Sequence, residues 1–119
     1  MNLTISINIT LLMLHNLKHH CQQKKVPYKI ASCYLGFLTE QIKRYYLQRG
    51  YQQTAVQSSL KRGTYFLQKG EQQVEITQIL TTDPLVALFQ VKCEKNELAD
   101  LEAKLKSIGI PPKYIGFSH

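Results

Sequence analysis

Residues 28–50, YKIASCYLGFLTEQIKRYYLQRG, form the longest stretch of the chain with a single helical period. Apolar and aromatic side chains recur there every three or four residues, at Ala31, Tyr34, Leu35, Leu38, Ile42 and Tyr45. Because an α-helix has 3.6 residues per turn, this spacing places them on one face. Pro27 before the stretch and Gly50 at its end predict a helix that begins near Tyr28. Gly36 in its middle predicts that another element packs closely there.

The residues before this helix change their period once. Residues 2–10 alternate, with Leu3, Ile5, Ile7 and Ile9 on one side and polar residues on the other, which predicts a strand. From Leu11 to about Gln23 the apolar residues follow helical spacing. An alternative is one helix over residues 4–22, because β-branched residues disfavour a helix only mildly. We favour the strand, so we expect the apolar N-terminal stretch to belong to the fold and not to anchor the chain in a membrane.

The segments after the main helix carry strand signals. Residues 51–63 are ambiguous between a short helix and a strand, and we favour a strand or irregular structure. Residues 64–93 predict three antiparallel strands joined by a turn at Lys69-Gly70 and another at residues 82–84. The last of these strands is apolar on both sides, so we expect it at the centre of the sheet with packed material on both faces.

The C-terminal segment predicts a second amphipathic helix over residues 96–109, NELADLEAKLKSIG, with Asn96 as its N-cap and Gly109 as its stop. Its apolar stripe consists of Leu98, Leu101, Leu105 and Ile108. Two prolines end the helix, and residues 113–117, KYIGF, predict a short final strand.

Length and composition favour one globular domain. A chain of 119 residues buries its apolar surface in a single core. Hydrophobic residues make up 44% of the chain and charged residues 19%, which excludes a disordered protein. We therefore predict a small single-domain α+β protein, with an antiparallel meander of three to five strands packed by two or three helices. Residues 1–62 form its basic, mainly helical half, and residues 63–119 contain the meander and the C-terminal helix.

The charge of the chain is unevenly distributed. Its formal charge is +7, but residues 1–70 contain ten basic residues and one acidic residue, for +9. Residues 71–119 contain five basic and seven acidic residues, for −2. A surface of one sign attracts a partner of the opposite sign, and phosphate polymers are the commonest such partner for a basic surface.

Within the basic half, cations alternate with aromatic residues between residues 43 and 69. Cations can contact phosphates, and exposed rings can stack on bases. The predicted nucleic-acid-binding residues are Lys43, Arg44, Tyr46, Arg49, Tyr51, Lys61, Arg62 and Lys69. This is a compositional signal without a known nucleic-acid-binding motif, and the competing interpretation is a solvated basic face with tyrosines at the rim of the core.

Two further functions stay open. The first is a protein-interaction module, such as an adaptor, inhibitor or assembly factor, that binds an acidic protein through the exposed edge of the meander or through its amide-rich surface. An exposed sheet edge would also allow a homodimer. The second is a small nuclease of the toxin type, which needs only a few Lys, Arg, His and Tyr side chains around a phosphate.

No catalytic motif is visible. Only one carboxylate, Glu40, precedes Glu71, and the chain has no glycine-rich phosphate loop. The only candidate metal ligands at chelating spacing are His15 and His19, four residues apart, and polar histidines near a helix end are the more usual interpretation. We therefore expect a non-enzymatic protein without a cofactor. Three cysteines without a CxxC pair fit a reducing, cytoplasmic location, and no signal peptide or membrane segment is predicted.

Overall fold

The computed structural model of the chain describes residues 2–83 and 85–118, which form one α+β domain. Its elements are β1 (Asn2–Thr10), α1 (Leu11–Asn16), α2 (Lys18–Lys24), α3 (Ala31–Gln48), β2 (Gln52–Ser58), β3 (Arg62–Lys69), β4 (Gln72–Leu80), β5 (Val86–Glu94), η1 (Lys95–Glu97), α4 (Leu98–Ser107), η2 (Pro112–Tyr114) and β6 (Ile115–Ser118). The strands form one six-stranded antiparallel sheet in the order β2-β3-β4-β5-β1-β6. The predicted meander is β3-β4-β5, and the sheet exceeds the predicted three to five strands.

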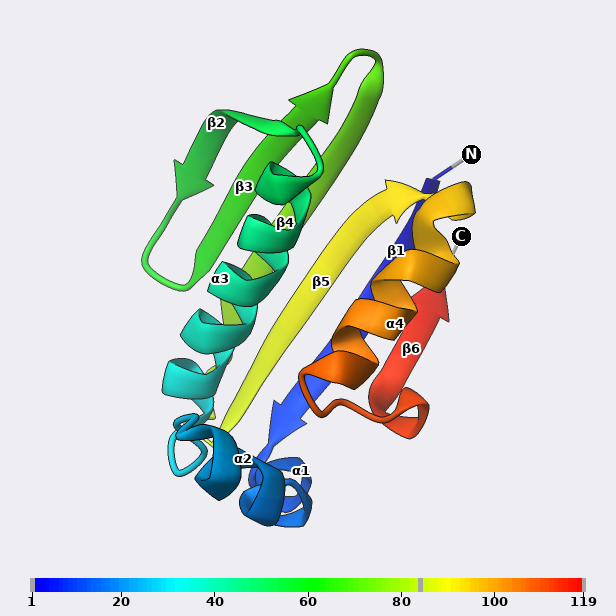
Figure 1. Ribbon diagram of the computed structural model, residues 1–119. Helices are drawn as coiled ribbons and strands as arrows, with labels where there is room; N and C mark the ends of the chain where they lie inside the picture. The colour runs from blue at the N-terminus through cyan, green and yellow to red at the C-terminus, as the bar shows by residue number, and fades with distance from the viewer. Residues whose placement is uncertain (1, 84, 119) are drawn as a thin grey trace.

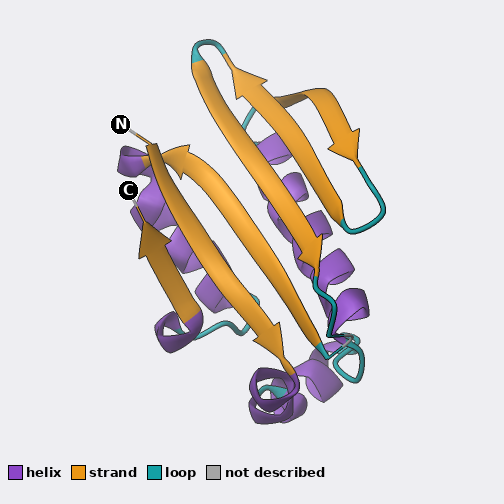
Figure 2. Ribbon diagram, turned by 180° about the vertical axis from the view of Figure 1, so that it is seen from behind, coloured by secondary structure: helices purple, strands orange, loops and turns teal. Residues whose placement is uncertain are grey.

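The domain has two layers. Helices α3 and α4 cover one face of the sheet, and α1 and α2 lie at one end of it (Figure 1). Seen from behind, the strands carry no helix across them in the described part of the chain (Figure 2). The basic and acidic halves of the chain do not fold apart, because β1 pairs with β5 and β6 from the second half.

Residues 2–10 form a strand, which confirms the alternating pattern over the single-helix alternative. The register of β1 with β5 and β6 turns its four aliphatic residues, Leu3, Ile5, Ile7 and Ile9, into the core. Thr10 then caps α1, since its side-chain oxygen accepts a hydrogen bond from the Met13 amide at 3.1 Å. The helical segment that follows is broken into α1 and α2 at Leu17.

The main helix begins at Ala31, three residues later than predicted. The preceding segment is held against α2 instead: the Val26 amide donates to the Cys21 carbonyl at 2.8 Å, and the Tyr28 hydroxyl accepts from Gln22 at 3.1 Å. Ile30 is extended and serves as the N-cap. The prediction of a close neighbour at Gly36 is wrong, because a Cβ placed there would meet no atom of another described element within 4 Å.

Strand β5 lies centrally between β4 and β1, as predicted. The prediction that it is covered on both faces is wrong, since only its inward residues Ala87, Phe89, Val91 and Cys93 pack beneath the helices. Leu88 faces the uncovered side, where it lies opposite Asn8 and Ile79. Leu88 is partly buried by these neighbours on the adjacent strands. Strand β5 can therefore be apolar on both sides although helices cover only one face of the sheet.

The C-terminal segment follows the prediction with one correction. Asn96 is not the N-cap, because residues 95–97 form the 3₁₀ turn η1 and α4 begins after Glu97, whose side chain is buried. Leu101 and Leu105 are in the core, and Leu98 and Ile108 pack against it. The predicted final strand is present as β6.

Candidate nucleic-acid interface

The six predicted cations lie on two elements, α3 and β3, and on the residues next to them. Lys43 and Arg44 project from α3 and Arg49 from its C-terminal end, whereas Lys61, Arg62 and Lys69 belong to β3 and the turn before it. Helix α3 packs mainly on β4 and β5 (Figure 1), so Lys43 and Arg44 lie on the helix side of the sheet, whereas Arg62 lines a hollow on the uncovered face.

Three of these cations are engaged within the protein. Lys43 pairs with Glu40 at 3.4 Å and lies over the Tyr65 ring, 4.6 Å from its centroid. Arg49 pairs with Asp100 at 3.2 Å and donates to the Tyr45 hydroxyl, which links α3 to α4. Lys69 donates to the Arg49 carbonyl oxygen at 2.8 Å. These contacts help to hold α3 in place, so each of the three side chains has fewer hydrogen-bond donors free for a ligand.

Arg44, Lys61 and Arg62 are different. All three are exposed, and none makes a side-chain hydrogen bond or ion pair with another described residue. A cation that has no partner inside the protein loses no internal interaction when it contacts a phosphate. We call these three residues, with the neighbouring Lys43, Arg49 and Lys69, the basic edge.

The two tyrosines predicted to stack on bases are in the core, so this prediction is wrong. Tyr46 is 0% exposed and Tyr51 3% exposed, and their rings meet edge to face with centroids 5.1 Å apart. Tyr46 follows Leu38 and Ile42 at four-residue intervals, and this spacing could have identified it as part of the buried stripe. The neighbouring Tyr45 is only partly buried, although the helical pattern had assigned it to the core.

Beneath these rings lies a buried polar cluster that sequence reasoning missed. The Tyr51 hydroxyl donates to Oε1 of Glu97, while Oε2 of Glu97 and the Tyr46 hydroxyl have no hydrogen-bond partner among the described residues. Burial raises the pKa of the neighbouring Cys93 thiol to about 11, and the charge of Glu97 adds to this rise. A thiol with this pKa stays protonated at neutral pH, so Cys93 is a poor nucleophile.

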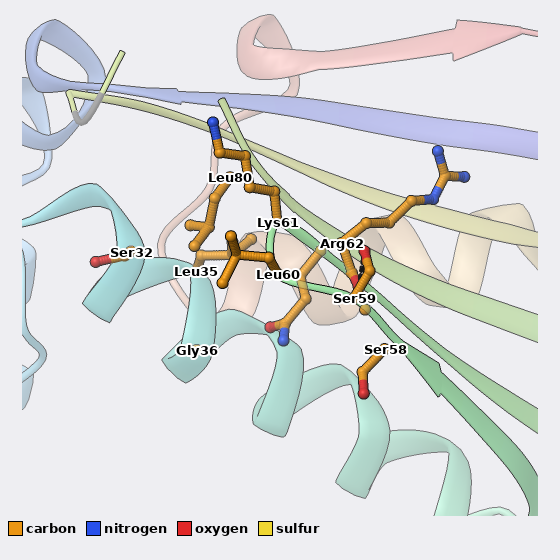
Figure 3. Close-up of a pocket in the computed structure, with 11 residues that line it drawn as sticks. Ser32, Leu35, Gly36, Ser58, Ser59, Leu60, Lys61, Arg62 and Leu80 are labelled. Atoms are coloured by element: carbon orange, nitrogen blue, oxygen red, sulfur yellow. Dashed lines mark hydrogen bonds between the residues drawn. The ribbon is translucent and has the colours of Figure 1, made fainter. Parts of the chain in front are cut away.

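A recess of about 260 Å³ opens beside the basic edge, between the start of α3 and the turn that joins β2 to β3 (Figure 3). Its walls are Ser32, Leu35 and Gly36 from α3, residues 58–63, and Gln78 and Leu80 from β4. Gly36 leaves space on the helix side, while Gln78 packs against Gly63 and contacts the Thr39 hydroxyl at 3.2 Å. The recess is therefore shaped by small residues on both sides.

The electrostatics of this recess are positive. Lys61 and Arg62 are at its margin, and Figure 3 shows the Arg62 side chain extending away from α3. The adjacent first turn of α3 contains no acidic residue, and Ile30 offers no capping side chain. The positive end of the helix dipole thus has no carboxylate in its own first turn, and Asp83 is the acidic residue that lines a neighbouring hollow with Ile30 and Lys61.

Among the described residues, His15, His19 and His20 do not form a metal site with other ligands. His15 is on α1 and His19 on α2, both exposed and on either side of the break at Leu17. Across residues 2–83 and 85–118, no group of three or more His, Cys, Asp or Glu side chains is placed to hold a metal ion. His20 has a structural role, since its ring packs against Gly109.

None of the helices described is long and apolar enough to cross a membrane. Comparisons of the chain with protein-family models, with curated proteins and with solved structures found no match.

Proposed function

We propose that this protein binds nucleic acid, without catalysing a reaction on it, through the basic edge. The observation that supports this function best is the set of three exposed cations, Arg44 on α3 and Lys61 and Arg62 at the start of β3, that have no partner within the described chain. Exposed arginine and lysine side chains without internal partners are the electrostatic feature that a phosphate backbone recognises.

Neighbouring charges favour an anionic partner at this edge. Glu40 is the only acidic residue among residues 1–70, and Lys43 already pairs with it. The acidic residues of the second half include Asp100, which pairs with Arg49 at the far end of α3. Two carboxylates lie near this edge, since Asp83 lines a hollow with Lys61 and Glu75 lines another with Arg62, but neither forms an ion pair with these cations and Glu75 already pairs with Lys92.

Binding is favoured over turnover by the chemistry of the side chains around the recess. Its walls offer serine hydroxyls, a glutamine amide and two cations, which donate hydrogen bonds to an anion but do not supply a general base. A nuclease would need such a base, or a metal, next to the scissile phosphate. Intact oligonucleotide after prolonged incubation with the protein is the expected result.

Salt dependence tests the proposal. Each neutralised phosphate contributes roughly −0.7 to −0.9 to the slope of log affinity against log salt concentration, so three contacts give a slope between about −2 and −3. The variant Arg44→Gln/Lys61→Gln/Arg62→Gln should remove most of this slope. Its matched control, Lys95→Gln/Lys104→Gln/Lys106→Gln, removes the same charge on the α4 side and should keep the slope.

Two outcomes would overturn the proposal. Equal losses in the two triple variants would show that net charge alone attracts the oligonucleotide and that the basic edge is not the site. An absence of binding by the parent protein at about 50 mM salt would exclude nucleic acid as the partner, because backbone contacts are strongest at low salt.

A second candidate function, binding of a protein partner, rests on β2. Every residue of this edge strand is exposed, none is charged, and its outer side pairs with no described strand. Natural sheets usually protect such an edge with charges or prolines, so an unprotected edge favours the addition of a strand from another chain. Either an acidic protein or a second copy of this chain could supply that strand.

A further inference from the structure

The uncovered face of the sheet contains a hollow of about 500 Å³ that is separate from the recess beside α3. It extends across the sheet from β2 to β1, and Arg62, Thr64 and Phe66 of β3 form one of its walls. We call it the sheet hollow. Its size is within the range of pockets that hold small organic ligands.

Strand register explains why the sheet is hollow there. Thr64 of β3 lies directly opposite Thr77 of β4, so two short side chains meet at the centre of the face. Although no helix covers them, they are only 8% and 7% exposed because longer side chains surround them. Their hydroxyl oxygens are 3.2 Å apart. When one hydroxyl donates to the other, the second keeps its own proton for a ligand.

The rim combines three kinds of recognition group. Gln57 and Gln90 offer amides, and Gln90 is oriented by a 3.3 Å contact with the Ser6 hydroxyl. Phe66 is an aromatic ring on the solvent side of the sheet, where it also lines a second hollow toward β2. Arg62 is a guanidinium without a partner among the described residues, whereas Lys92 pairs at 3.5 Å with Glu75, a carboxylate that also lines the hollow.

Arg62 connects this hollow with the basic edge, because it is a lining residue of both the recess and the sheet hollow. A ligand phosphate at Arg62 would therefore have cations on one side and, on the other, a cavity with amides, hydroxyls and a ring. A phosphate polymer without bases could use only the first of these. A single-stranded nucleic acid could use both.

We propose that the sheet hollow holds one nucleotide unit of a single strand whose backbone follows the basic edge. The base stacks on Phe66, the amides of Gln57 and Gln90 hydrogen-bond to its edge, and Arg62 contacts the adjoining phosphate. Base stacking on an aromatic side chain is a general mode of single-strand binding, and a base in a duplex cannot reach such a ring. The proposal rests on the nucleic-acid function proposed above and specifies its substrate as single-stranded.

Fluorescence anisotropy tests it with three probes: a labelled single strand of about 12 nucleotides, the duplex of the same sequence, and polyphosphate as a competitor. Phe66→Ala should weaken single-strand binding by about 5- to 150-fold and leave competition by polyphosphate unchanged. Phe66→Leu, which keeps apolar volume but removes the ring, should behave in the same way. Phe117→Ala is the matched control, because Phe117 is an exposed phenylalanine of β6 outside the hollow and should leave affinity unchanged.

A cross-linking measurement on the parent chain does not depend on the folding of a variant. A strand that carries 5-iodouracil, irradiated in the complex, should attach to the tryptic peptide of residues 63–69, which contains Phe66. Wild-type affinity in both Phe66 variants, or cross-links only to α3, would overturn this inference and leave the basic edge as a backbone site. A parent protein that binds neither the oligonucleotide nor polyphosphate would overturn the proposed function itself.

Discussion

The Tyr51 hydroxyl, in the turn after α3, donates a hydrogen bond to the Glu97 carboxylate at the start of α4. Both residues are buried, and Arg49 and Asp100 form an ion pair between the same two segments nearer the surface. Glu97 thus joins α3 and α4, the two helices that cover the sheet. Its side chain points into the core and makes no capping hydrogen bond with the N-terminus of α4.

Tyr51→Phe should lower the free energy of unfolding by about 1 to 3 kcal/mol, because it leaves a buried carboxylate oxygen without its donor. Tyr65→Phe is the control, since the Tyr65 hydroxyl makes no hydrogen bond to a described residue, and it should change stability by less than about 0.5 kcal/mol. Urea denaturation of both variants gives the comparison. Equal stability of the two variants would contradict the structural role of the Tyr51–Glu97 contact.

Two glycines should respond in opposite directions to substitution by alanine. Gly109 has φ +96°, and a Cβ there would lie 2.4 Å from the His20 ring, so Gly109→Ala should destabilise the protein by more than about 1 kcal/mol. Gly36 is inside α3 with open space around its Cβ position, so Gly36→Ala should stabilise it by up to about 1 kcal/mol. Thermal melts measure both changes. A destabilised Gly36→Ala would show that the recess is already filled by a neighbouring group.

Stability should fall in alkaline solution. The pKa of the Cys93 thiol is about 11 in the folded protein, against its usual value of 9.0, mainly because the thiol is buried. Between about pH 9 and pH 11 the unfolded chain releases this proton while the folded chain keeps it, so the folded state loses stability as pH rises. Burial likewise raises the pKa of Tyr46 and Tyr51, which extends the effect above pH 10.

Urea midpoints measured between pH 8 and about pH 10.5 check this expectation. Cys93→Ala should be less stable than the parent at pH 8 but should lose less stability across this interval, because it has no thiol to titrate. Parallel pH curves for the parent and Cys93→Ala would contradict the assignment.

The helices and the meander could be predicted because each leaves a periodic signal within its own segment. Residues 2–10 alternate because only one side of β1 meets the core, and α3 has a stripe because one side faces the sheet. Strand β2 left no such signal, since all of its residues are exposed and neither side selects for apolar residues. Its strand state depends on pairing with β3, which local sequence does not show.

Of the candidate site, only the charged residues could be predicted from the sequence. The cations could be identified from composition, but which of them are engaged internally depends on contacts such as Arg49 with Asp100, 51 residues apart in sequence. The sheet hollow could not be predicted, because it exists only when Thr64 and Thr77 are in register. Tyr45 and Tyr46 are adjacent, so a small rotation of the helix decides which of the two rings is buried.

Strand β2 should mediate a weak homodimer whose stability increases with salt. If two copies pair antiparallel about a two-fold axis, the start of one β2 lies beside the end of the other. This arrangement brings Arg49 and Lys69 of one copy toward Lys61 and Arg62 of the other, so like charges oppose association. Raising salt from about 0.1 to 1 M shortens the Debye length from about 10 to 3 Å and should relieve this repulsion.

Sedimentation analysis should therefore show a monomer at low salt and a growing dimer fraction at high salt, the reverse of the trend expected for nucleic-acid binding. Val56→Lys adds a charge to the middle of β2, where Val56 is exposed, and should abolish the dimer at every salt concentration. Lys106→Gln, on the distant α4, is the control and should dimerise as the parent does. Two results would contradict this prediction: a dimer that weakens as salt rises, or a dimer that Val56→Lys leaves intact. Either would mean that the copies associate through another surface, which leaves the β2 edge available to a different protein.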